Sequence, residues 1–163
     1  DLTPDDIEII TWVLNEAGKN VSAADYSESL GGWDLAGAQM AEFHREYDLY
    51  LTPTNAHPAP KIGELLPSAE MQEQLLKVDH LRQAEQQKLV YDMFLPSLTY
   101  TPFTQLANLT GQPAMSVPTF ITREGLPMGV QFVASKGRED QLIALASQIE
   151  QSELWKQKVV TDI

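Results

Sequence analysis

The alternation of apolar and polar positions divides this chain into helices and short strands. From Thr3 to Gly18, apolar residues recur every three or four positions, as they do on one face of a helix. Thr3 can cap such a helix, Pro4 suits its first turn, and Gly18 suits its end. Trp12 lies off the apolar stripe, which predicts that it faces a partner surface. The stripe consists of Ile7, Ile10, Val13, Leu14 and Ala17.

A second, longer helical pattern runs from Ser22 to about Arg45. Ser22 and Asp25 have the spacing of a capping box. The adjacent Gly31 and Gly32 weaken the middle of the helix by about 1–2 kcal/mol relative to alanine, so we expect close packing or a kink there. A strand at residues 49–52 follows, and this order of elements favours the α/β class.

The middle of the chain reads as exposed. Prolines at positions 53, 58 and 60 exclude an interior strand and predict an irregular rim segment. Ser68 can cap the next helix, which we expect Pro96 to end. Its many glutamines predict that residues 61–100 form a helical insertion or lid.

A short helix, two strands and a final helix complete the pattern. The short helix starts at Phe103 and ends where Gly111 permits a left-handed cap. A strand at 114–117 is expected to end at Pro118, and a turn around Gly125 returns the chain into a second strand. Gly129 in that strand leaves room for close packing. The last helix is predicted at 139–151.

Composition excludes several classes of function. The chain carries 23 acidic and 11 basic residues, a net charge of −12, which disfavours binding to nucleic acid and to anionic membranes. It has no cysteine, as is compatible with a cytoplasmic protein, and no apolar run near the roughly 18 residues of a membrane span. No signal peptide is recognised at the start of the sequence, and we expect further sequence upstream of Asp1.

The chain offers few candidates for chemistry. Its three histidines are scattered without ligand spacing, so no metal site is predicted. Ser116 lacks the flanking glycines of a nucleophile elbow, and no loop has the glycines and lysine that cradle a phosphate. We therefore expect no cofactor and no catalytic residue in this chain.

Several runs of residues resemble the C-terminal region of the amidase signature family. They are Asn-Leu-Thr-Gly-Gln-Pro-Ala at 108–114, Ser-Val-Pro at 116–118, Gly-Leu-Pro at 125–127 and Leu-Thr-Pro-Thr at 51–54. Within the family, the opening helix and the segment 18–26 are most similar to bacterial amidases related to 6-aminohexanoate-cyclic-dimer hydrolases. The resemblance implies an α/β fold in which helices pack on a mixed sheet of few strands.

The resemblance also implies that the reactive part lies elsewhere. Family members use a serine nucleophile, a second serine on a cis peptide and a lysine base within a Gly/Ser-rich core, and this chain has no adjacent serine pair. We therefore expect residues 1–163 to form a single C-terminal (sub)domain of a larger amidase. Its partners are then the missing N-terminal catalytic part and a small-molecule amide substrate, and the isolated chain is expected to be inactive.

By the same resemblance, four residues line the substrate pocket: Thr101, Phe103 and Thr104 beside the substrate, and Asn55 near the mouth. Plain packing is the alternative for each. Thr101 lies where glutamine-using amidotransferases of the family carry an acidic residue, which implies a preference for amides without a charged amine.

Two other readings of the chain remain open. It could be an acidic interaction module that descends from an amidase and has no catalysis, or an independent hydrolase that uses Ser116 and a histidine. An open sheet edge and the faces bearing Trp12 and Trp33 also predict a homo-oligomer.

Overall fold

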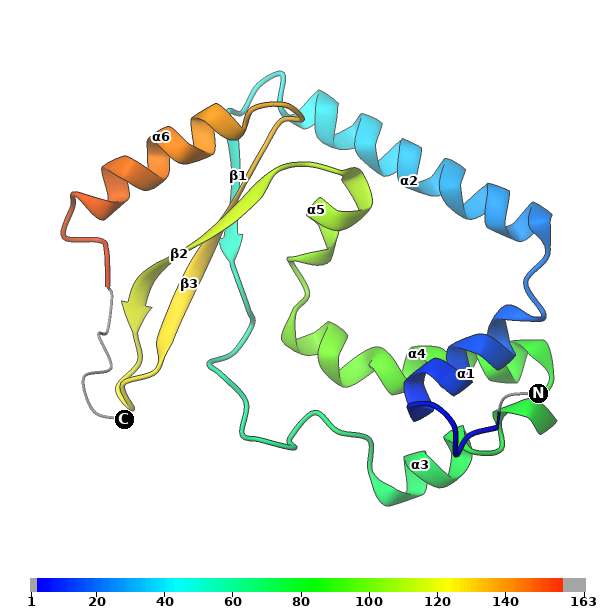
Figure 1. Cartoon of the computed structure of the whole chain (residues 1–163). Helices are drawn as coiled ribbons and strands as arrows, with labels where there is room; N and C mark the ends of the chain where they lie inside the picture. Colours follow the sequence, from blue (N-terminus) through cyan, green and yellow to red (C-terminus); the bar gives the residue numbers. More distant parts are fainter. Residues whose placement is uncertain (1–2, 157–163) are drawn as a thin grey trace. The chain divides into compact units, whose positions relative to one another are not determined.

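The computed structural model describes residues 3–156. The chain forms two compact units, and each is built from two separate stretches of sequence. The first unit comprises the residues up to Ser29 and Lys61–Thr99, and the second comprises Leu30–Pro60 and the residues from Tyr100 onward. Figure 1 labels the helices and strands of both units, which are described in turn.

The first unit is helical and has its own apolar core. Trp12 and Val13 of α1 pack there with Leu75, Val78 and residues of α4. The segment 61–100 thus shares a core with the opening helix, and its role as a lid stays a prediction. The elements of this part are α1 (Ile9–Gly18), the start of α2 (Ala23–Phe43), α3 (Ala69–Leu75), the 3-10 helix η1 (Val78–His80) and α4 (Gln83–Tyr100).

The opening helix differs from its prediction in two ways. It begins at Ile9 rather than at Thr3. The residues before it form a separate turn, because the Asp6 carboxylate accepts hydrogen bonds from the Thr3 backbone N–H (2.8 Å) and from the Thr3 hydroxyl (2.7 Å). Trp12 is only 7% exposed and belongs to the core, so the prediction that it faces a partner was wrong. Packing against α3 and η1 instead leaves Ile10 and Leu14 exposed.

Capping at two other helices is confirmed. At the start of α2, the Asp25 N–H donates to Ser22 Oγ and the Ser22 N–H donates to Asp25 Oδ2, both at 3.1 Å. At α3, the Met71 N–H donates to Ser68 Oγ at 3.1 Å. Hydrogen bonds of this kind satisfy backbone donors that a helix start leaves unpaired.

Glycine and proline inside helices behave differently from expectation. Helix α2 is continuous through Gly31 and Gly32, and a methyl group on either would meet no atom within 4 Å, so the close packing predicted there is absent from the described residues. Helix α4 continues past Pro96 to Tyr100, where an end was predicted. Proline removes one helical hydrogen bond, and here the helix tolerates that loss.

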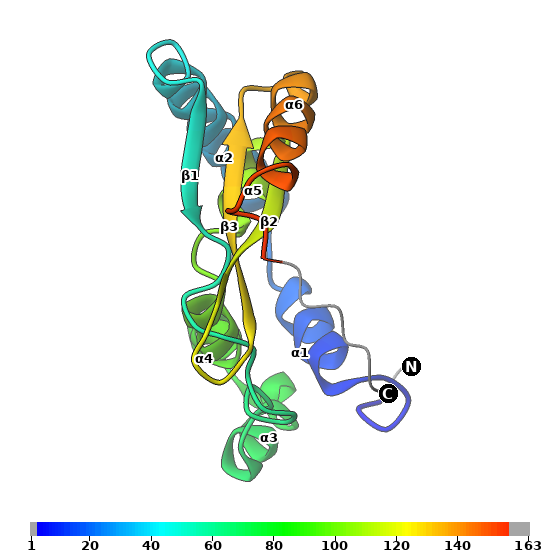
Figure 2. The ribbon, with the colours of Figure 1, turned by 90° about the vertical axis from the view of Figure 1, so that its left-hand side faces the viewer.

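The second unit contains a three-stranded sheet with β3 at its centre. The order is β1-β3-β2, and both pairings are antiparallel. The α/β class is confirmed, while the described strands form an antiparallel rather than a mixed sheet, because β2 and β3 are a hairpin and β1 adds to the free side of β3. Helix α6 packs against β2 and β3 (Figure 2). The elements are β1 (Leu49–Pro53), α5 (Gln105–Thr110), β2 (Ala114–Ile121), β3 (Pro127–Ala134) and α6 (Glu139–Glu150).

The turns around β2 follow the predicted glycines. Gly111 caps α5 in the left-handed conformation (φ 67°), and Gly125 has φ 83° in the hairpin turn. The strand itself runs past Pro118, where it was predicted to end, to Ile121. An irregularity in register between Pro118 and Phe120 accommodates the proline, which has no N–H for the ladder.

Gly129 is the point of closest approach in the sheet. A methyl group at this position would lie 2.5 Å from Ser116 Oγ and 3.1 Å from both Thr54 Oγ1 and the Val117 carbonyl oxygen. The predicted close packing is therefore confirmed. Its cause is steric, since φ at Gly129 is not positive.

We expect Gly129→Ala to destabilise the second unit by about 1–3 kcal/mol, because the new methyl group overlaps atoms of the neighbouring strand. Urea denaturation followed by circular dichroism measures the loss. Ser116→Gly removes the nearest oxygen, so the double variant should recover part of the stability, as a double-mutant cycle would show. An unchanged midpoint for Gly129→Ala would contradict the steric argument.

A pH-dependent contribution is expected at the start of α4. The Arg82 side chain donates to both carboxylate oxygens of Glu85 (2.8 and 3.1 Å), and these bonds, with one from the Arg82 backbone, lower the Glu85 pKa from 4.5 to about 2. A lowered folded-state pKa stabilises the protein above the ordinary value, and the contribution is lost as pH falls toward about 2.

Arg82→Ala should therefore lower the urea midpoint near neutral pH by a small amount, because the pair is exposed. The difference from wild type should shrink as pH falls from about 4.5 to about 2. The exposed Arg123, replaced by alanine, is the control. A difference that stays constant over this pH range would refute the assignment.

Candidate functional site

One face of the sheet carries a stripe of uncharged polar side chains. Thr52 of β1 and Ser116 of β2 are both register partners of Gln131 on β3, so the three lie side by side on the same face. Two residues further along the same face, the Thr54 N–H donates to the Gly129 carbonyl at 3.0 Å. The stripe therefore crosses all three strands and continues beyond the end of β1.

Two buried glutamines attach helix α5 to this sheet. The Gln131 side chain is 5% exposed, and its Nε2 donates to the Phe103 carbonyl at 3.3 Å and lies 3.5 Å from Thr52 Oγ1. At the other end of the helix, Gln112 Nε2 donates to the Ala134 carbonyl at 3.0 Å, and Thr110 Oγ1 donates to Gln112 Oε1 at 2.8 Å. Both ends of α5 are thereby fixed by amides that have little access to water.

A small pocket of about 170 Å³ lies at the end of the polar stripe. At its centre, the hydroxyls of Thr54 and Ser116 are 2.5 Å apart and share a hydrogen bond, directly over Gly129. Asn55 and His57 from the irregular segment also line the pocket, and none of its lining residues within 3–156 is Asp, Glu, Lys or Arg. The pocket thus offers hydroxyl, amide and imidazole groups to a bound molecule.

The irregular segment over the pocket is held by Tyr100. The Tyr100 hydroxyl donates to the Pro58 carbonyl at 2.8 Å, and the Ala56 N–H donates to the Tyr100 carbonyl at 2.9 Å. These bonds fix the segment that carries Asn55 and His57. The prolines of this segment limit its backbone further.

The four predicted site residues lie in two places. Asn55 lines the small pocket beside the hydroxyl pair. Thr101, Phe103 and Thr104 do not line it and belong to the stretch that leads into α5, where Gln131 holds the Phe103 carbonyl and Thr104 Oγ1 donates to the Thr101 carbonyl at 3.4 Å. Contact of all four with a substrate stays a prediction.

Sequence reasoning missed the groups that build the pocket. Thr54, His57 and Tyr100, which line the pocket, were not predicted as site residues, and neither was Gln131, which holds the Phe103 carbonyl. Ser116 was considered only as a nucleophile. A signal did exist in the sequence, because Thr52 and Thr54 stand at alternate positions at the end of β1, and Ser116 and Gln131 interrupt the apolar strands β2 and β3. Only the register shows that these interruptions meet on one face.

The pocket holds no activated nucleophile among the described residues. Ser116 and His57 line it together, but the hydrogen bond of Ser116 goes to the Thr54 hydroxyl, which is no general base. Within residues 3–156, no group of three or more His, Asp or Glu side chains could hold a metal ion. The helices described here are too short or too polar to cross a membrane.

Comparison with known proteins relates this arrangement to one family. The family model Amidase matches residues 7–143. The lipoamidase of Enterococcus faecalis is 42% identical over 149 residues, which are 91% of this chain and 21% of that protein. The 6-aminohexanoate-cyclic-dimer hydrolase of Paenarthrobacter ureafaciens is 32% identical over 155 residues, 94% of this chain and 29% of that protein.

A solved structure agrees with the sequence comparisons. The 6-aminohexanoate cyclic dimer hydrolase in complex with its substrate superposes with a TM-score of 0.70 at 27% identity, over 94% of this chain and 30% of the hydrolase. This chain therefore spans between about a fifth and a third of the length of the relatives that it matches. Its sequence motifs, its antiparallel sheet with α5 fixed on one face and these matches together show that the chain belongs to the amidase family.

Proposed function

We propose that this chain is the C-terminal portion of an amidase and supplies one wall of its substrate pocket. The observation that carries the proposal is the match over nearly the whole chain to only 21–30% of each amidase compared above. The serine nucleophile, the bridging serine and the lysine base then lie in the portion outside this chain. Amide hydrolysis proceeds there through an acyl-serine intermediate.

The chemistry of the pocket favours neutral amides as substrates. Its polar groups are uncharged hydroxyls and amides with one imidazole, and they can bind a carbonyl oxygen or an amide N–H without leaving a charge unpaired. The relatives named for lipoamide and for a cyclic amide dimer support this class. We infer that small linear or cyclic amides are hydrolysed, in the cytoplasm of a bacterium.

In this proposal the hydroxyl pair positions part of the substrate or of the catalytic portion. Each hydroxyl can donate and accept, so Thr54 and Ser116 have hydrogen-bonding capacity left after their mutual bond. Asn55 adds an amide at the same mouth. β3 and Tyr100 hold these groups in place, as is required of residues that orient a substrate.

The isolated chain should show no amidase activity, because no described serine of the pocket has a base within hydrogen-bond reach. A chimera in which this chain replaces the matching segment of the Enterococcus faecalis lipoamidase should hydrolyse lipoamide. Turnover of aryl and alkyl amides by the purified chain and by the chimera tests both statements.

Two results would contradict this function. Hydrolysis by the isolated chain that Ser116→Ala abolishes would make it an independent hydrolase. A chimera that folds but does not hydrolyse any amide would instead favour the non-catalytic acidic interaction module. The parent lipoamidase is the control for the assay.

Thr101→Asp in the active chimera should shift preference toward amides that carry an α-ammonium group. A neutral hydroxyl supplies no counter-charge, and desolvating an unpaired ammonium costs several kcal/mol, whereas an aspartate can pair with it. The ratio of kcat/KM for an α-amino amide to that for the neutral analogue measures the shift. Thr99→Asp, two residues earlier, is the matched control, and equal ratios for both variants would remove Thr101 from the pocket.

A further inference from the structure

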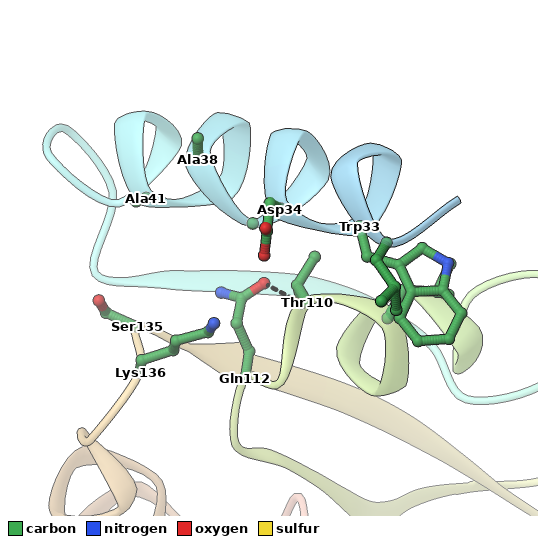
Figure 3. A pocket seen from close by; sticks show the side chains of 11 residues that line it. Trp33, Asp34, Ala38, Ala41, Thr110, Gln112, Ser135 and Lys136 are labelled. Atoms are coloured by element: carbon green, nitrogen blue, oxygen red, sulfur yellow. Dashed lines mark hydrogen bonds between the residues drawn. The ribbon is translucent and has the colours of Figure 1, made fainter. Parts of the chain in front are cut away.

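A second, larger hollow of about 560 Å³ lies in the same unit as the sheet. Figure 3 shows it between α2, the end of α5 and the residues that follow β3. Its α2 wall runs from Leu30 to Ala41 along one helix face, because the lining positions are separated by three or four residues. Three turns of helix, roughly 17 Å, therefore border one continuous groove.

The groove leaves apolar surface open to water. No residue of the 21-residue helix α2 is buried. Leu30 and Trp33 are 37% and 48% exposed on the α2 wall, and Leu109 of α5 is 43% exposed beside them. A helix gains most of its stability in a protein by burying an apolar face. The apolar side chains of the α2 wall are instead exposed, so we expect another element to pack against them.

The groove also holds two charges of opposite sign. Asp34 projects into it from α2 and Lys136 from the opposite wall (Figure 3). Lys136 Nζ lies 3.6 Å from the position of a methyl group on Gly111 and 3.9 Å from one on Gly37, so it reaches the carbonyl end of α5. No ion pair of either side chain is found among the described residues.

Small residues make the α2 wall accessible to a polypeptide backbone. Gly37, Ala38 and Ala41 occupy the central and last turns of the groove face. Side chains of this size let a neighbouring helix or strand approach closely, while Trp33 and Leu30 provide the apolar contacts at one end. The three helical turns that border the groove are long enough for a chain segment to lie along them.

We propose that this groove seats a segment of the amidase polypeptide that lies outside this chain, with apolar side chains against Leu30 and Trp33 and an acidic group against Lys136. The inference rests on the proposed function, since more than two-thirds of each compared amidase lies outside the matched region. A second copy of this chain fits less well, because it carries the same net charge of −12.

The test uses Ala38→Trp, which fills the groove from an exposed position. In the isolated chain the variant should leave the thermal midpoint unchanged. In the lipoamidase chimera it should lower the midpoint by several degrees and the rate of lipoamide hydrolysis at least about tenfold, because it displaces the seated segment and small displacements of catalytic parts are costly. Ala144→Trp on α6, exposed and outside the groove, is the matched control and should change neither protein.

Lys136→Glu gives a second measurement, which acts through charge and not through the size of an inserted side chain. It should lower the midpoint of the chimera more than that of the isolated chain, where only the contact of Lys136 with the carbonyl end of α5 is lost, and both effects should be smaller at high salt.

The outcomes separate this inference from the proposed function. An active chimera that tolerates both Ala38→Trp and Lys136→Glu would overturn the groove assignment and leave the proposed function standing. An inactive parent chimera would remove the proposed function and the inference together. A loss of stability as large in the isolated chain as in the chimera would assign the groove to the chain's own fold. A change seen only in the sedimentation of the isolated chain, from dimer to monomer, would assign it to a second copy. Either result would likewise overturn the inference.

Discussion

The hydrogen bonds of two buried glutamines are the constraint on which the sheet unit depends. Gln131 and Gln112 are 5% and 9% exposed, so each amide must find its partners within the protein. They find them on both sides of α5, at the Phe103 carbonyl and at the Thr110 hydroxyl, and Gln112 also reaches β3. A purely apolar contact could slide, whereas these amides fix the helix at one position on the sheet.

The same strand that carries Gln131 also places the hydroxyl pair. Gly129 lies two residues earlier on β3, and its missing side chain lets Thr54 and Ser116 meet above it. Scaffold and pocket are therefore not separate features of this unit. A change in β3 therefore alters the attachment of α5 and the geometry of the pocket together.

Local backbone chemistry was the part of the fold that sequence could predict. Gly111, Gly125 and the Ser22–Asp25 capping box act over a few residues, and their outcome depends on little else. Trp12 was misjudged because its burial depends on a residue far along the chain, Leu75, which packs in the same core. Pro96 was misjudged because α4 tolerates the proline and continues to Tyr100. The same distinction between local features and distant contacts applies to the candidate site. Asn55 was predicted from a family motif, but the meeting of Thr54 with Ser116 across 62 positions needs the register of three strands.

Helix α2 carries apolar side chains that remain exposed among the described residues. Gly31 and Gly32 weaken the helix and meet no close neighbour, while Leu30 and Trp33 next to them expose apolar area, so two unfavourable features occur on one element. Neither is explained by the contacts that residues 3–156 make. The exposed apolar side chains are accounted for if a further segment of the amidase covers the groove face of α2, because burial then stabilises them, whereas Gly31 and Gly32 do not line that face. The exposed groove face of α2 is then a surface that packs inside the complete amidase.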